Sequence, residues 1–125
     1  MARSRNSAKK AGAQMEILVE SFLKEHVSEF ITRLRLAGSK DVGDIGNVRS
    51  LDGKRIVIEV KNYGGEFKVT PWLNEARVEA GNADAPIAVV IAKRRGTTDP
   101  AKQVVFMELG DFAQLLGADI EMETP

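Results

Sequence analysis

The 125-residue sequence predicts a single α/β domain, and three of its features carry that prediction. Apolar residues recur at helical spacing between Gly12 and about His26, which indicates an amphipathic helix. Two strand-like segments flank Asp52-Gly53, a dipeptide typical of a tight hairpin turn. The run from Pro86 to Ala92 is almost continuously apolar, as expected of a strand buried on both faces of a sheet.

These features place the elements in the order αβββαββα. After the first helix we expect strands over residues 30–36, 44–51 and 55–61, the last two joined by the hairpin. Thr70 and Pro71 are a suitable N-cap and first position for a helix to about Ala80, which Gly81-Asn82 would close. Strands over 86–92 and 103–109 follow, and Asp111 caps a short helix that ends at Gly117.

Composition excludes several classes of protein. The chain has no cysteine, so it has neither a disulfide framework nor a thiolate zinc site, and its single histidine excludes a histidine-rich metal site. No signal peptide is recognisable, and the longest apolar run, residues 85–92, is too short to cross a membrane. We therefore expect a cytoplasmic protein with no membrane partner.

The net charge of zero hides an asymmetry along the chain. Residues 1–110 carry 18 basic and 14 acidic residues, whereas residues 111–125 carry four acidic residues and no basic one. We expect residues 1–11 to form a flexible arm that can settle along a phosphate backbone or merely aid solubility, and residues 118–125 to form an acidic tail. The basic residues of the arm are Arg3, Arg5, Lys9 and Lys10.

The hairpin brings together the residues with the most chemical content. If Asp52 and Gly53 are its two loop residues, Asp44 lies opposite Lys61, and Gly46 lies opposite Glu59. Asp44, Glu59 and Lys61 then project from one face. The two carboxylates belong to diagonal neighbours, roughly 7–8 Å apart at the backbone, and both can reach one ion.

Two residues sit awkwardly in this register. Asn47 and Arg49 fall on the core side of their strand, so either the hairpin tip extends beyond the core or the register slips there. A slip of one residue would turn Asp44 away from Glu59 and remove the site.

Five segments form an ordered set: G-A-Q-M-E at 12–16, G-S-K-D-V-G-D-I at 38–45, I-E-V-K-N at 58–62, T-P-W-L-N-E-A at 70–76 and the strand ending in K-R-R-G at 93–96. In this order they resemble the PD-(D/E)XK nuclease superfamily. The similarity is greatest to its Holliday-junction-resolvase branch, in particular the small resolvase-like proteins of phages, and it spans about residues 10–117. Gly43 stands where the superfamily motif has proline, and Val42 where arginine is common, so a phosphate contact is absent.

The resemblance implies a restriction-endonuclease-like fold over residues 12–117, with a mixed β-sheet flanked by helices. It implies a metal-dependent endonuclease that cuts four-way DNA junctions as a homodimer in DNA recombination and repair, in the host cytoplasm if phage-encoded. All-oxygen ligands favour Mg²⁺ or Mn²⁺. Asp44, Glu59 and the Val60 carbonyl would hold the ion, Glu16 would bind it directly, through water or at a second ion, and Lys61 would orient water or neutralise charge.

The helix carboxylate and the neighbouring acid leave alternatives open. On a helical wheel Glu16 lies about 90° from the centre of the apolar stripe and Glu20 about 130°, so Glu16 is preferred and Glu20 is held in reserve. Asp41 either assists Asp44 at the site or caps the turn that enters the strand.

Further candidates concern DNA contact, and each has a structural alternative. Arg33 and Arg35 face DNA or solvent, while Lys93, Arg94 and Arg95 bind phosphate or form a solvated turn. Trp72 is first of all a core or dimer anchor. The enzyme alternatives are a flap, nick or restriction-type nuclease, and a different class is a catalytically silent DNA-binding subunit. The intact set of Asp44, Glu59 and Lys61 argues against a silent protein.

Overall fold

The computed structural model describes residues 3–35, 38 and 40–122. Within them it confirms the α/β class, because a five-stranded mixed sheet is flanked by three α-helices. Residue 36 of the first expected strand, residues 1–2 of the expected arm and residues 123–125 of the expected tail lie outside the described residues. The elements are α1 (Arg5–His26), β1 (Thr32–Arg33), β2 (Ile45–Gly46), β3 (Ile56–Lys61), α2 (Val69–Asn82), β4 (Ile87–Ala92), the 3₁₀ turn η1 (Pro100–Lys102), β5 (Val104–Phe106) and α3 (Leu109–Leu115).

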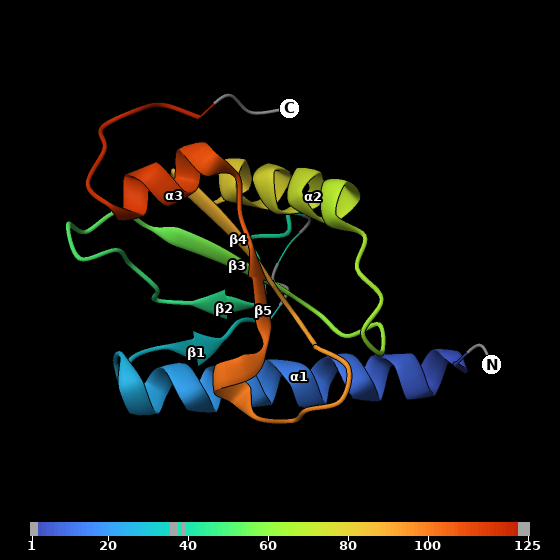
Figure 1. The fold of residues 1–125 in the computed structure, drawn as a ribbon. Coiled ribbons are helices and arrows are strands. Elements are labelled where there is room, and N and C mark those ends of the chain that lie inside the picture. The colour runs from blue at the N-terminus through green and yellow to red at the C-terminus, as the bar shows by residue number, and fades with distance from the viewer. Residues whose placement is uncertain (1–2, 36–37, 39, 123–125) are drawn as a thin grey trace.

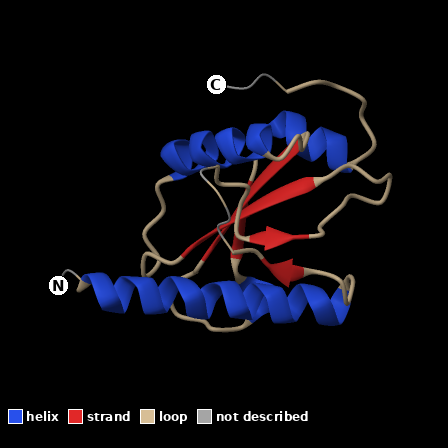
Figure 2. Cartoon of the chain, turned by 180° about the vertical axis from the view of Figure 1, so that it is seen from behind, coloured by secondary structure: helices blue, strands red, loops and turns tan. Residues whose placement is uncertain are grey.

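The sheet lies between two helical layers (Figure 1). Its strands run β1-β2-β3-β4-β5 across the sheet, and all neighbours are antiparallel except β3 and β4. On one face Met15 of α1 packs with Ile58 of β3, and on the other Trp72 of α2 packs with Val57. Figure 2 shows the same layers from behind. Because successive residues of a strand point to opposite faces, Glu59 projects toward the α2 side with Val57.

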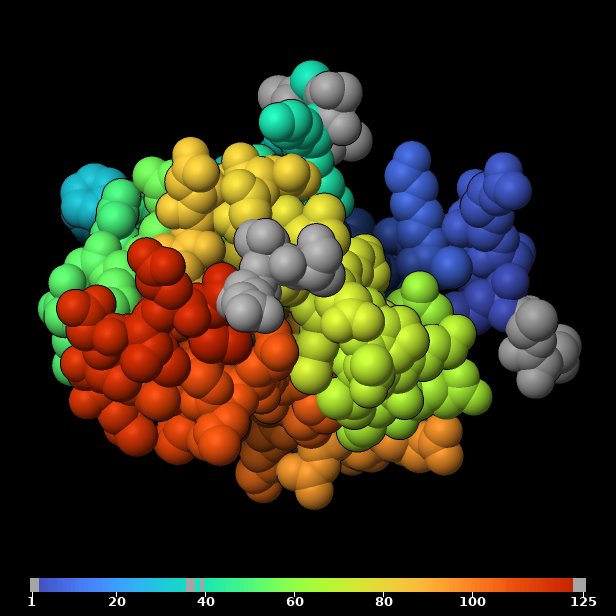
Figure 3. Space-filling model, turned by 90° about the horizontal axis from the view of Figure 1, so that it is seen from above, coloured from blue at the N-terminus to red at the C-terminus, as the bar shows by residue number. Residues whose placement is uncertain are grey.

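α1 is longer at its N-terminus than expected. It begins at Arg5, and Ser4 caps it by accepting a hydrogen bond from the Ser7 N–H at 3.1 Å. The expected start at Gly12 was therefore wrong, and most of the expected arm is helical. In Figure 3 these first turns (blue) project beyond the body beside the segment that follows β3. Their exposed basic side chains are those of Arg5, Lys9 and Lys10.

The hairpin loop between β2 and β3 contains three residues instead of two. The Ser50 N–H donates to the Lys54 carbonyl at 2.8 Å, and Gly53 between them has a φ of +88°. The predicted two-residue turn was therefore wrong. A three-residue loop with glycine in the left-handed region is another common solution for a hairpin.

A bulge in β2 shifts the register once more. Arg49 pairs with Arg55, but Ile45 pairs with Ile58, so the first strand of the hairpin contains one extra residue. Asn47 lies in this stretch with a φ of +65°, a conformation that asparagine tolerates better than most residues. The register thus slips at the place where the sequence pattern was awkward.

Asp44 lies just before β2 and is not opposite Lys61 as expected. Its N–H donates to the Ile58 carbonyl and its carboxylate Oδ2 accepts from the Val60 N–H, both at 2.8 Å, so Asp44 lies beside this part of β3. The Asp44 carboxylate is also near enough to Glu59 to raise the pKa of that acid. Gly46 is not opposite Glu59 as expected, and a Cβ at Gly46 would lie 2.6 Å from Leu34 Cδ2.

The expected caps of the later helices were wrong for a common reason, namely tertiary packing. Thr70 lies inside α2, whose N-cap is Lys68 and has no side-chain capping bond. Asp111 lies inside α3 and is fully buried, where it accepts hydrogen bonds from the Arg77 guanidinium and, at 3.0 Å, from the Ala88 N–H. Asp111 therefore ties α3 to α2 and β4 instead of capping its own helix.

No helix among the residues described is both long and apolar enough to span a bilayer.

Candidate active site

Asp44 is held in place by its own backbone and by its side chain. Its N–H donates to the Ile58 carbonyl, and its carbonyl accepts from the Leu34 N–H, both at 2.8 Å. Its carboxylate Oδ2 accepts from the Val60 N–H, also at 2.8 Å. These bonds fix the carboxylate beside β3, just before the first residue of β2.

Gly43 allows this placement because a side chain at this position would be both strained and crowded. Its φ is +96°, and a Cβ there would lie 2.9 Å from Val57 Cγ1 and 3.0 Å from the Ile58 carbonyl oxygen. Proline, which the superfamily motif has at this position, would require a φ near −65° and would remove the N–H that donates to the Asp41 carboxylate at 2.9 Å. Glycine is thus the residue that suits this backbone best.

Glu59 is a buried acid surrounded by other acids. It is 6% exposed, and its Oε2 has no hydrogen-bond partner among the described residues. Burial raises the pKa of Glu59 strongly, and the neighbouring carboxylates of Glu79 and Asp44 raise it further. Without a cation, Glu59 therefore holds a proton at neutral pH.

Lys61 lies two residues further along the same face of β3. Its Nζ is 3.0 Å from both carboxylate oxygens of Glu75 in α2. Burial acts to lower the pKa of Lys61, but the bond to Glu75 and the other neighbouring acids outweigh it, so the net shift is upward. Lys61 is therefore a cation at neutral pH.

The two candidate acids of α1 have different surroundings. The Glu16 carboxylate accepts from the Arg33 Nε and Nη2, each at 3.3 Å, and burial followed by the charge of Asp44 raises its pKa. Glu20 instead accepts from the Arg33 backbone N–H at 2.6 Å and from the Thr32 hydroxyl at 3.4 Å. Glu16 thus lies near the charge of Asp44, whereas Glu20 accepts a hydrogen bond from a backbone N–H of the edge strand β1.

Glu79 of α2 was not among the residues expected at the site. It is 2% exposed, and it offers a carboxylate oxygen within 4.8 Å of oxygens from Asp41 and Glu59. Burial, together with the charge of Asp41, raises the pKa of Glu79. The sequence did contain a signal, because Trp72, Ala76 and Glu79 share the helical spacing of a buried stripe.

Asp41 combines the two roles left open for it. Its Oδ1 caps the turn by accepting from the Gly43 N–H, and its carboxylate also lies within reach of Glu59 and Glu79. Its backbone carbonyl accepts from the Asn82 Nδ2 at 2.8 Å, which anchors the loop to the end of α2. The grouped acids Asp41, Glu59 and Glu79 could hold a metal ion.

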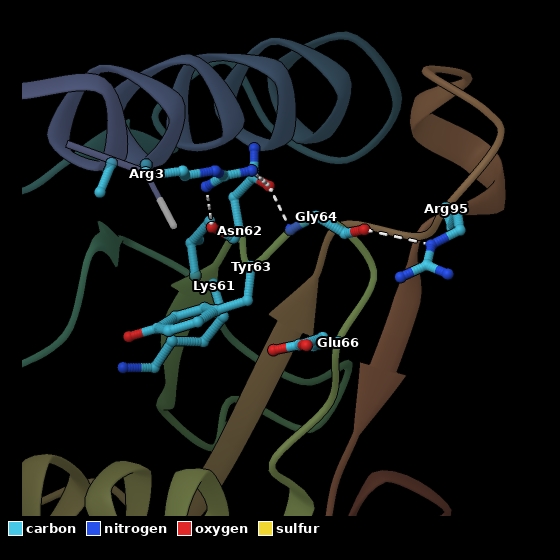
Figure 4. A pocket seen from close by; sticks show the side chains of 10 residues that line it. Arg3, Lys61, Asn62, Tyr63, Gly64, Glu66 and Arg95 are labelled. Atoms are coloured by element: carbon cyan, nitrogen blue, oxygen red, sulfur yellow. Dashed lines mark hydrogen bonds between the residues drawn. The ribbon is translucent and has the colours of Figure 1, made fainter. Parts of the chain in front are cut away.

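A cavity of about 750 Å³ opens beside Lys61 (Figure 4). Val60, Lys61 and the loop after β3 form its floor, and Arg3 and Arg95 reach it from the start of the chain and from the loop after β4. Arg3 donates to the Asn62 carbonyl at 2.7 Å, and the Arg95 Nε donates to the Gly64 carbonyl at 3.4 Å. Two cations therefore line the cavity besides Lys61.

The other basic candidates lie outside this cavity. Lys93 donates to the carbonyls of Arg94 and Thr97 at 2.5 and 2.7 Å. Its ammonium therefore stabilises the turn that follows β4. Arg33 is paired with Glu16. The remaining basic candidates, Arg5, Lys9, Lys10, Arg35 and Arg94, are exposed and do not line the cavity.

The donor set suits a hard divalent cation. It consists of carboxylate oxygens, and those of the buried Glu59 and Glu79 lack donors among the residues described. No family model, curated protein or solved structure matches this chain, so its function is inferred from the site itself.

Proposed function

We propose that this chain is a metal-dependent endodeoxyribonuclease with a restriction-endonuclease-like fold, which cuts branched DNA and most specifically four-way junctions. The observation that carries the proposal is the convergence of Asp44, just before β2, with Glu59 in β3, and the presence of Lys61 on the same face of β3. The resemblance of the ordered motifs to the resolvase branch supports it, as does the order αβββαββα of the elements.

The residues near the carboxyl end of the central strand β3 fit a Mg²⁺ or Mn²⁺ ion. Asp44, Glu59 and the Val60 carbonyl would hold it, since the Val60 N–H meets Asp44 and both backbone groups of a strand residue face the same edge. Glu16 is near enough to Asp44 for that charge to raise its pKa, and in this proposal it contributes to the ion directly or through water. A bound ion would supply a more acidic water and would neutralise charge on the scissile phosphate.

Lys61 would contribute a fixed positive charge next to the attacked phosphate. As a compact ammonium that is charged at neutral pH, it can orient the attacking water or stabilise the negative charge that develops during hydrolysis. Its two bonds to Glu75 hold it in place before DNA arrives. A phosphate oxygen of the substrate would compete with Glu75 for the ammonium.

The basic cavity offers a path for the DNA backbone toward Lys61. Arg3 and Arg95 would contact phosphates, and the exposed cations on the first turns of α1 would extend the contact. Binding of this kind depends on the shape and phosphate pattern of the DNA more than on its base sequence. It should weaken as salt rises.

Symmetric cutting of a junction needs two active sites, which a twofold dimer supplies. Trp72 is 4% exposed and is unavailable for this contact, or for stacking on an unpaired base. The apolar side chains Phe112, Leu115 and Leu116 at the end of α3 are 47%, 38% and 75% exposed. We place the homodimer contact there.

The test is cleavage of a labelled four-way junction beside matched duplex, flap and single-stranded DNA, in Mg²⁺, Mn²⁺ and EDTA. Paired symmetric nicks in the junction alone, absent in EDTA and in Lys61→Ala, are the expected result. Cutting of all forms alike would replace the resolvase by a general nuclease. No cutting of any form, with equal DNA affinity for the wild type and Asp44→Asn in metal, would indicate a DNA-binding protein without activity.

A further inference from the structure

We propose that Asp41, Glu59 and Glu79 form a second divalent-cation site, next to the one assigned to Asp44, Glu59 and the Val60 carbonyl. Glu59 would be shared between the two ions. The role of the second ion rests on the proposed nuclease function, but its binding does not, because binding can be measured without DNA.

The three acids converge from separate parts of the chain. Asp41 comes from the loop before β2, Glu59 from the middle of β3 and Glu79 from the last turns of α2, and each offers an oxygen within 4.8 Å of the others. The loop that carries Asp41 is tied to α2 by the bond from Asn82. The fold therefore holds the three carboxylates together even though they repel one another.

Burial without a partner is the second observation that points to an ion. Glu79 is 2% exposed, and neither of its oxygens has a hydrogen-bond partner among the described residues, nor has Oε2 of Glu59. A buried carboxylate that lacks donors and counter-charges is costly, and a bound cation removes this cost. No salt bridge within the described residues involves any of the three acids.

Two other acids of this chain, one fully buried and one on the same helix, each have a positively charged partner. The fully buried Asp111 is paired with Arg77 and accepts the Ala88 N–H. On α2, Glu75 lies one turn before Glu79 and meets Lys61. The helix thus directs one acid to the lysine of β3 and the other to Glu59, and only the second lacks a cation in the described structure.

The chemistry of the site selects the kind of ion. Three carboxylates and no nitrogen or sulfur donor favour a hard cation such as Mg²⁺, Mn²⁺ or Ca²⁺ over zinc. Asp41 is exposed, so an ion can enter from its side and can keep water ligands. The competing arrangement is one in which Glu59 and Glu79 share protons and no second ion binds.

Calorimetric titration of the full chain with Mn²⁺, in the absence of DNA, separates these arrangements. We expect the wild type to bind two ions. Glu79→Gln should keep only the ion at Asp44 and the Val60 carbonyl, and Asp44→Asn should keep only the ion at Asp41 and Glu79. Glu75→Gln removes the same charge from the same helix outside the trio, and it should still bind two ions. Thermal melting in EDTA checks that each variant is folded, and Mn²⁺ should raise the melting temperature of Glu79→Gln less than that of the wild type.

A wild type that binds a single ion, with the count and the Mn²⁺-induced stabilisation unchanged in Glu79→Gln, would overturn the second site. That outcome together with metal-dependent cleavage would leave the nuclease proposal standing. Two bound ions, one of them lost in Glu79→Gln, in a protein that cuts no DNA would instead retain the second site and refute the nuclease proposal.

Discussion

Replacing Gly43 with alanine should both destabilise the chain and displace Asp44. At φ +96° a residue with a Cβ costs roughly 1–2 kcal/mol relative to glycine. The new Cβ would also lie 2.9 Å from Val57 Cγ1 and 3.0 Å from the Ile58 carbonyl oxygen, and overpacking of this kind costs about 1–3 kcal/mol. We therefore expect the free energy of unfolding to fall by about 2–5 kcal/mol.

Gly53 provides a matched control for the backbone part of this effect. Its φ is +88°, but a Cβ there would meet no atom within 4 Å. Gly53→Ala should therefore lose only the backbone part, about 1–2 kcal/mol. Urea unfolding followed by the fluorescence of the buried Trp72 measures both losses.

The two variants should differ more in activity than in stability. Relief of the contact with β3 requires the Gly43 segment to move, and this lengthens the 2.8 Å bonds from Asp44 to Ile58 and Val60. Misplacement of a catalytic group by about 1 Å can cost on the order of 100-fold in rate, so junction cleavage by Gly43→Ala should fall by about 10- to 100-fold. Gly53→Ala should cut at the wild-type rate. Equal stability and equal cleavage in the two variants would refute this reasoning.

Three further predictions concern the buried and helix-borne acids. Asp111→Ala removes the fully buried partner of Arg77, which keeps only the ion pair with the exposed Glu108, and leaves the Ala88 N–H without its acceptor. It should lower the free energy of unfolding by about 3–5 kcal/mol in urea, whereas a loss below about 1 kcal/mol would contradict a tight buried pair. Without metal, the pKa of Glu79 is raised from 4.5 to about 7, chiefly by burial, so the native state binds a proton more tightly than the unfolded state. Stability should thus fall as the pH rises through that range, and melting temperatures of Glu79→Gln should depend less on pH. Glu16→Gln should slow cleavage with little change in melting temperature, whereas Glu20→Ala should lower stability by about 1–3 kcal/mol and preserve cleavage, because Glu20 accepts a backbone N–H of β1.

The local pattern of the sequence determined which segments form the main elements. The apolar stripe of α1 and the alternation in β3 each depend on residues near one another in the chain, so spacing alone revealed them. For the same reason the sequence placed Glu59 and Lys61 on one face of β3 and the apolar Ile56, Ile58 and Val60 on the other. It could also indicate Glu16 as the acid at the boundary of α1.

The register of the hairpin was not determined in this way. Asp52-Gly53 is compatible with loops of two or three residues, whose energies differ little, and Asn47 permits a bulge without requiring one. Packing of Ile45 and Ile58 into the core with α1 distinguishes these arrangements. The approach of the Asp44 carboxylate to Val60 and Glu59 is therefore a product of the tertiary structure.

The remaining site residues depend wholly on contacts between distant segments. Glu79 reaches Glu59 because α2 packs its Trp72 and Ala76 stripe on the sheet, and Arg3 reaches the cavity because α1 extends past the end of β3. The sequence thus determined the chemical types of the residues and the faces on which they lie. Only the folded chain decided which charges meet, since that depends on how elements far apart in the sequence pack against one another.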